Sequence, residues 1–98
     1  AEKNIAPAYT KLGIDLNAKP KDSSKLSGTS SKIMQSELER GKLLHVSVDT
    51  LGSKKGGHSI AVVSYSNGYF EIADGWSASF RNVAYSDMNV KQVVAVNY

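Results

Sequence analysis

The sequence predicts one α+β domain over residues 1–98, with N-terminal helices on one side of a twisted antiparallel sheet of four to five strands. Three observations predict this class. Two β-rich runs flank Asn67-Gly68, a pair typical of a type I′ hairpin turn because both central residues need positive φ. Apolar residues alternate in the run 42–49, as they do in half-buried strands, and the run 92–98 is an apolar strand with Val93-Val94-Ala95-Val96 as its core piece. Apolar residues at helical spacing precede all of these strands.

The first helix is expected from Asn4 to Leu12, with Asn4 as its N-cap and with Gly13 in the left-handed conformation that ends the helix. Four residues form one apolar stripe and are expected to face the core: Ile5, Ala8, Tyr9 and Leu12. The run 15–31 is rich in Lys, Ser, Asp and Pro. It is predicted to be a long connection with one helical turn near 23–26.

A second helix is expected to begin at Ser30 or Ser31 and to end at Gly41. The residues predicted to form its buried side are Ile33, Met34 and Leu38. The next run, 42–49, is predicted to be a strand whose inward residues are Leu44, Val46 and Val48. Residues 50–57 are predicted to form a polar Gly/Lys loop that leads into the central hairpin.

The central hairpin covers residues 56–76, and its alternation predicts which residues share a face. The first strand is expected to place His58, Ile60, Val62 and Ser64 together, and the second strand Phe70, Ile72 and Asp74. In the simplest register Asp74 lies opposite Ala61, and His58 falls beyond the second strand. A stagger, a bulge or the twist of the sheet is therefore needed to bring Asp74 to the His58 ring. A short strand at 80–85, a turn at Ser86-Asp87 and the strand at 92–98 are expected to follow.

Composition restricts the chemistry open to this chain. It has no cysteine and only two histidines, so disulfides, thiolate metal sites and a cysteine nucleophile are excluded. We expect no metal site and no cofactor, because the carboxylates are not clustered around a histidine. No apolar run is long enough to span a membrane, so no membrane partner is expected. The net charge of +3 suits RNA or another anionic partner.

His58 and Asp74 are the candidates for catalysis. A single histidine at a strand start is commonly a structural residue, and an aspartate before glycine is commonly a turn residue. The surroundings of His58 favour a functional role. Gly56-Gly57 lets a ligand approach the main chain, Lys54-Lys55 supplies positive charge, and Trp76 follows Asp74 closely.

These motifs resemble a known family. The runs Gly57-His58-Ser59-Ile60-Ala61-Val62-Val63 and Ile72-Ala73-Asp74-Gly75-Trp76, either side of Asn67-Gly68-Tyr69, are similar to the latter half of papain-like domains of the bacteriocin-processing peptidase type. In that family a histidine that opens one strand is catalytic, and an aspartate that closes the next strand orients it. The resemblance assigns these roles to His58 and Asp74. The family's cysteine would fall at Ile5 or a neighbour, so thiol chemistry is not available to this chain alone.

A domain that keeps the histidine without the thiol still has the parts for RNA cleavage, because RNA supplies its own nucleophile, the 2′-hydroxyl. His58 near neutral pH is suited to take that proton, and lysines stabilise the charge that develops on phosphorus. Trp76 is suited to stack on a base. The residues expected to bind RNA are Ser53, Lys54, Lys55, Ser59 and Trp76.

Small, basic, cysteine-free domains of this kind resemble the C-terminal toxin domains of bacterial contact-dependent growth-inhibition proteins. Some of those toxins are transfer-RNA nucleases with a papain-like shell and use host translation elongation factors. The resemblance implies an RNase toxin that cleaves transfer RNA by metal-independent transphosphorylation. It implies a cognate immunity protein, and an elongation factor as a further partner. It also implies secretion within a larger bacterial surface protein and delivery to the cytoplasm of the target cell.

Two other classes of function remain open. The chain is a catalytically dead papain-like binding module if His58 and Asp74 are only structural. It is one half of a cysteine hydrolase if the cysteine lies on a missing chain, which predicts a large exposed apolar face. Replacement of His58 by alanine separates an enzyme from a binding module, because only an enzyme loses activity while it stays folded.

Overall fold

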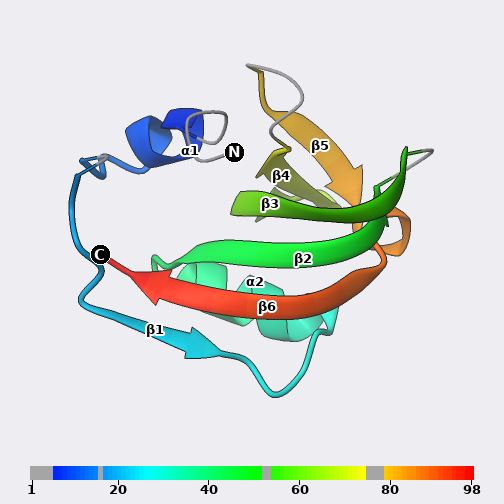
Figure 1. Ribbon diagram of the computed structural model, residues 1–98, viewed down its shortest axis with the longest axis horizontal. Coiled ribbons are helices and arrows are strands. Elements are labelled where there is room, and N and C mark those ends of the chain that lie inside the picture. The colour runs from blue at the N-terminus through cyan, green and yellow to red at the C-terminus, as the bar shows by residue number, and fades with distance from the viewer. Residues whose placement is uncertain (1–5, 16, 52–53, 75–78) are drawn as a thin grey trace.

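In the parts of the chain that the structure describes, the protein is an α+β domain with two α-helices and a six-stranded antiparallel sheet (Figure 1). The computed structural model describes residues 6–15, 17–51, 54–74 and 79–98. In chain order the elements are α1 (Ala6–Lys11), β1 (Asp22–Lys25), α2 (Ser31–Glu39), β2 (Leu43–Leu51), β3 (Lys54–Ser66), β4 (Tyr69–Ala73), β5 (Arg81–Ala84), a 3₁₀ turn (Tyr85–Asp87) and β6 (Val90–Asn97). The strand order is β1-β6-β2-β3-β4-β5. The predicted α+β class is confirmed, but the sheet has six strands where four to five were expected.

The additional strand is β1, in the stretch predicted to be a connection with one helical turn. It pairs antiparallel with β6, from Asp22 opposite Asn97 to Lys25 opposite Val94. All four of its residues are exposed, so it carries no apolar alternation. The prediction was wrong here because an edge strand is held by main-chain hydrogen bonds to its neighbour, which leave no pattern in the side chains.

The predicted polar loop at 50–57 is also wrong, because most of it belongs to a long hairpin. Strand β2 continues to Leu51, which pairs with Lys54 at the start of β3. The register shifts between Val48 and Thr50, so that Gly56-Gly57 of β3 stands against a single residue of β2. Glycine is common at such a bulge because it weakens regular strand packing and tolerates the bend.

The β3–β4 hairpin has the predicted turn, with φ of 53° at Asn67 and 88° at Gly68. Its register shifts between Val62 and Ser64, so Ala73 lies opposite Ala61, where the simplest register placed Asp74. The bulge also removes Ser64 from the face of Val62.

Two contacts locate Ser64 after this shift. Its hydroxyl donates to Glu71, at 2.9 Å, while the neighbouring rings of Tyr65 and Phe70 pack together on the opposite face. The predicted face shared by Ser64 and His58 is therefore wrong, because a bulge reverses the alternation beyond it.

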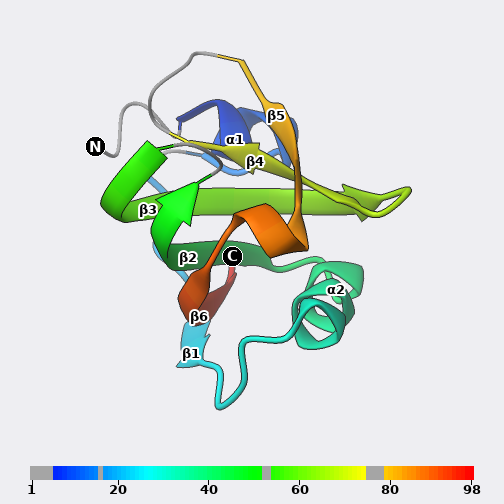
Figure 2. The same ribbon diagram turned by 90° about the vertical axis from the view of Figure 1, so that its right-hand side faces the viewer.

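The sheet has a buried cluster on each face. The larger cluster comprises Met34, Leu44, Val46, Val48, Leu51, Ile60, Val62, Phe70, Ile72, Val83, Met88, Val93 and Ala95. The smaller comprises Ala8, Leu43, Ala61, Val63 and Ala73. Helix α2 contributes Met34 to the larger cluster and α1 contributes Ala8 to the smaller one, so the helices cover opposite faces of the sheet (Figure 2). The expectation that both helices lie on one side was wrong.

Helix α1 is shorter than predicted in the part that is described. It covers Ala6–Lys11, and Gly13 has the expected left-handed conformation, with φ of 71°. Ala8 is fully buried, whereas Leu12 is 37% exposed and does not face the core as expected. The predicted cap Asn4 and the apolar residue Ile5 lie outside the described residues.

Helix α2 begins where the sequence predicts, and Ser30 caps it by accepting a hydrogen bond from the Ile33 amide at 3.2 Å. Met34 is fully buried and Leu38 packs against the same cluster. Ile33 is 38% exposed, so its predicted burial was wrong. Its side chain instead lies against Gly28 in the preceding connection, because a helix on a sheet buries only a narrow stripe.

Replacement of Met34 by alanine is expected to destabilise the domain by about 2 to 5 kcal/mol, because it leaves a cavity in the larger cluster. Replacement of Ile33 by alanine is the matched control on the same helix and is expected to cost about 1 kcal/mol or less. Urea denaturation of both variants measures the difference. Equal losses would contradict this assignment of the helix faces.

Candidate functional site

His58 lies on β3 opposite Val48, half-buried at one end of the face that carries the larger cluster. Its Nε2 atom is hydrogen-bonded to the main-chain carbonyl oxygen of Asp74. A carbonyl oxygen only accepts, so in the neutral ring Nε2 carries the proton and Nδ1 carries the lone pair. The geometry therefore assigns Nδ1 as the basic atom of the imidazole.

Asp74 follows directly after β4 and is buried, with its side chain only 1% exposed. Its Oδ2 atom accepts a hydrogen bond from Nη1 of Arg81, at 2.8 Å. Burial of a carboxylate is costly unless a cation and hydrogen bonds compensate for the lost water, and Arg81 supplies both. Asp74 thus contacts His58 through its main chain and Arg81 through its carboxylate, whereas the resemblance implied that the carboxylate orients the histidine.

The bulge in the β3–β4 hairpin brings these residues together. It shifts the register by one residue, so that Asp74 follows a pair formed by Ala73 and Ala61 and lies one step closer to His58 along β3. Asp74 is also on the face of Ile72, which belongs to the cluster next to His58. The sequence analysis required a stagger, a bulge or the twist of the sheet to bring Asp74 to His58, and the structure contains a bulge.

The residues predicted to bind RNA are only partly described. Ser59 is exposed beside His58 and lies opposite Ser47 of β2. The main chains of Lys54 and Lys55 begin β3, opposite Leu51 and Thr50. The predicted residues Ser53 and Trp76 lie outside the described residues.

Arg81 is a candidate functional residue that the sequence analysis missed. It is the first residue of β5, pairs with Ile72 of β4, and has a side chain that is 41% exposed. A buried aspartate needs a cation, and the nearest arginine in the sequence lies seven residues further on. That requirement is the one signal that points to Arg81, but it applies only once Asp74 is known to be buried.

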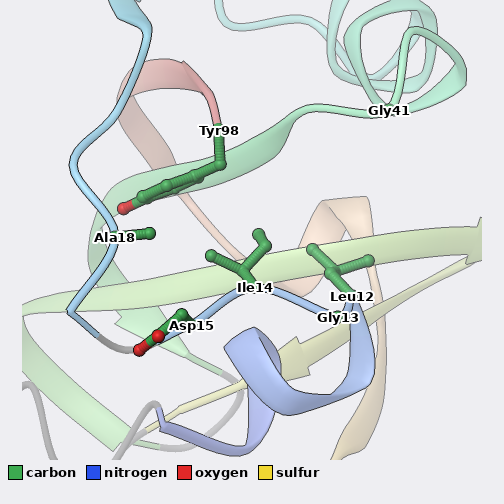
Figure 3. Close-up of a pocket in the computed structure, with 7 residues that line it drawn as sticks. All are labelled: Leu12, Gly13, Ile14, Asp15, Ala18, Gly41 and Tyr98. Carbon is green, nitrogen blue, oxygen red and sulfur yellow. The ribbon is translucent and has the colours of Figure 1, made fainter.

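A separate pocket lies on another part of the molecule, at the end of α1 (Figure 3). It has a volume of about 480 Å³ and is lined by Leu12, Gly13, Ile14, Asp15, Ala18, Gly41 and Tyr98. The Tyr98 hydroxyl is hydrogen-bonded to that of Tyr9, at 3.0 Å. None of these lining residues is a predicted site residue. The candidate site at His58 therefore rests on its contacts and not on this pocket.

Neither a metal cluster nor a membrane span was found in the parts of the chain that the structure describes. Within them, no three residues of the types His, Cys, Asp and Glu are grouped so as to hold a metal ion. No helix there has the length and apolar character needed to cross a membrane.

Comparisons with known proteins do not add to this description of the site. No protein-family model matches the chain, and no match was found among curated proteins or among solved structures. The function is therefore inferred from the residues themselves.

Replacement of Arg81 by alanine is expected to destabilise the domain by about 2 kcal/mol, because it leaves the buried Asp74 carboxylate without its cation. The value is below that of a fully buried pair because Arg81 is itself half-exposed. Arg40→Ala is the matched control, since Arg40 is 67% exposed and 3.7 Å from Glu37, and its loss is expected to cost about 0.5 kcal/mol or less.

The double variant Arg81→Ala/Asp74→Ala tests the cause of that loss. It removes the uncompensated charge as well, so it is expected to be more stable than Arg81→Ala alone. Chemical denaturation of the four proteins gives the comparison. A double variant that is less stable than Arg81→Ala would refute the assigned pairing.

Proposed function

We propose that this protein is an RNase toxin that cleaves transfer RNA by metal-independent transphosphorylation, with His58 as its general acid/base. The observation that carries the proposal is the bond from His58 Nε2 to the Asp74 carbonyl, on a half-buried ring. This bond gives the neutral ring a defined basic atom, Nδ1. Asp74 orients the ring in this proposal, but through its main chain.

The proposed reaction needs no nucleophile from the protein. His58 removes the proton from the 2′-hydroxyl, the 2′-oxygen attacks the adjacent phosphorus, the bond to the 5′-oxygen breaks, and the leaving 5′-oxygen takes a proton from protonated His58 or from water. The products are a 2′,3′-cyclic phosphate and a 5′-hydroxyl. A histidine in this role commonly contributes about 10²- to 10⁴-fold to the rate.

Positive charge near His58 supports binding of the scissile phosphate. Arg81 uses Nη1 for Asp74, and its side chain is 41% exposed, so other guanidinium N–H groups remain accessible for an anion. Lys54 and Lys55 begin the strand that carries His58. In this proposal they contact phosphate together with the Ser53 and Ser59 hydroxyls, and Trp76 stacks on a base.

The biological setting is proposed from the resemblance of the motifs around His58 and Asp74. In this setting the domain is the papain-like, cysteine-less toxin end of a larger bacterial surface protein and is delivered to the cytoplasm of a target cell. Its partners are transfer RNA, a cognate immunity protein and a translation elongation factor.

Two alternatives predict different observations. A dead binding module uses the contacts among His58, Asp74 and Arg81 only for stability. Half of a cysteine hydrolase should expose one large apolar face. Among the described residues the large exposed apolar side chains are Leu12, Ile33, Tyr65 and Tyr69, which are distributed over α1, α2 and the β3–β4 hairpin. This distribution gives no support to the half-hydrolase.

Replacement of His58 by alanine is expected to lower single-turnover cleavage of total transfer RNA by at least about 10²-fold, because the general base is removed. The melting temperature should change little, since Ile60 and Val62 supply the apolar burial on that face of the strand. His45→Ala is the matched control, because His45 is half-buried on the neighbouring strand β2 and should be dispensable for cleavage. Full cleavage by folded His58→Ala would disprove the mechanism.

Cleavage is expected to continue in EDTA, because acid–base catalysis and fixed cations suffice for transphosphorylation. Analysis of the fragment ends should show a 2′,3′-cyclic phosphate and a 5′-hydroxyl. Assays with and without cell extract separate intrinsic activity from a requirement for a host factor. Loss of cleavage in EDTA that Mg²⁺ restores, or recovery of a 5′-phosphate, would contradict this chemistry.

A further inference from the structure

We propose that Arg81 is a positioning residue that sets the tautomer of His58 by holding Asp74 in place. Asp74 makes two contacts through different parts of one residue. Its carboxylate accepts from Arg81, and its main-chain carbonyl accepts from His58. The cation and the imidazole are therefore connected through Asp74.

The topology makes this connection necessary. His58 lies on β3 and Arg81 on β5, and β4 separates these two strands in the sheet. Main-chain pairing joins β3 to β4 and β5 to β4, but it does not join β3 to β5. Asp74, directly after the end of β4, touches a side chain from each.

The position of Asp74 in the strand ladders shows why its carbonyl needs to be held. Among the described residues, the last pair between β3 and β4 is Ala61 with Ala73, and the last pair between β4 and β5 is Ile72 with Arg81. Asp74 therefore follows the last pairs that the described residues of these strands form. The ion pair restrains the aspartate side chain, and through its Cα and short side chain it limits the directions that the carbonyl can take.

This restraint has a chemical consequence at His58. A carbonyl aimed at Nε2 favours the tautomer protonated at Nε2 and leaves the lone pair on Nδ1. If the carbonyl moves away, the tautomer protonated at Nδ1 becomes populated and cannot use that atom as a base. The effect on cleavage rests on the proposed function, whereas the effect on the tautomer does not.

The tautomer is measured directly on the full 98-residue chain, with ¹⁵N-labelled histidine and long-range ¹H–¹⁵N correlation spectra at a pH where the ring is neutral. His58→Ala identifies the signals of His58 by their loss. The wild type is expected to be predominantly protonated at Nε2. Arg81→Ala and Asp74→Ala are each expected to raise the population of His58 protonated at Nδ1 several-fold, although the main-chain carbonyl of residue 74 is present in both variants.

Two further variants test specificity. Arg81→Lys keeps the positive charge and is expected to restore much of the wild-type ratio, while Arg40→Ala removes an unrelated exposed arginine and should leave the ratio unchanged. Arg81→Gln retains much of the side-chain length and answers the same question if Arg81→Ala does not fold. An unchanged tautomer ratio in folded Arg81→Gln and Asp74→Ala would overturn the proposal.

Transfer-RNA cleavage measured on the same samples distinguishes the two proposals. A wild-type protein that does not cleave RNA, but whose tautomer ratio changes in Arg81→Ala, refutes the RNase and supports the positioning role. A wild-type protein that cleaves RNA, and whose ratio and kcat are unchanged in Arg81→Ala, refutes the positioning role alone. A fall in kcat together with the change in tautomer supports both, and a rise in KM reports the separate loss of the phosphate contact proposed for Arg81.

Discussion

Burial of the Asp74 carboxylate is the constraint on which the rest of this end of the sheet depends. An ionised carboxylate that is only 1% exposed requires a cation, and the fold provides Arg81 at 2.8 Å. Arg81 reaches Asp74 because β5 pairs with β4 in a register that places Arg81 opposite Ile72. The same buried residue then presents its carbonyl to His58, so the ion pair and the imidazole belong to one arrangement.

Two bulges adapt the long strand β3 to this arrangement. At the first, Gly56-Gly57 stands against one residue of β2, and at the second the pairing with β4 shifts near Val63. The second bulge reverses the alternation, so Ser64 lies on the face opposite to that of Ile60 and Val62. It also advances Asp74 by one residue along β3. A regular hairpin with the same sequence would leave Asp74 opposite Ala61.

The absence of cysteine determines which chemistry is compatible with the site. Without a cysteine in the chain, thiol chemistry is excluded, whereas RNA carries a nucleophile of its own, the 2′-hydroxyl, beside every internal phosphate. A basic chain with Arg81 half-exposed near the ring suits that substrate. These features are the ones on which the proposed RNase activity depends.

The sequence by itself determined the features that depend on near neighbours in the chain. These are the Asn67-Gly68 turn, the cap of α2 at Ser30 and the alternating core of β2, because positive φ, capping and strand alternation are local properties. Only the tertiary structure decided the edge strand β1, the two register shifts, the opposite placement of the helices and the pairing of Arg81 with Asp74. Each of these depends on main-chain pairing or burial between different elements of the fold, and such contacts leave no periodic signal in the residues that make them.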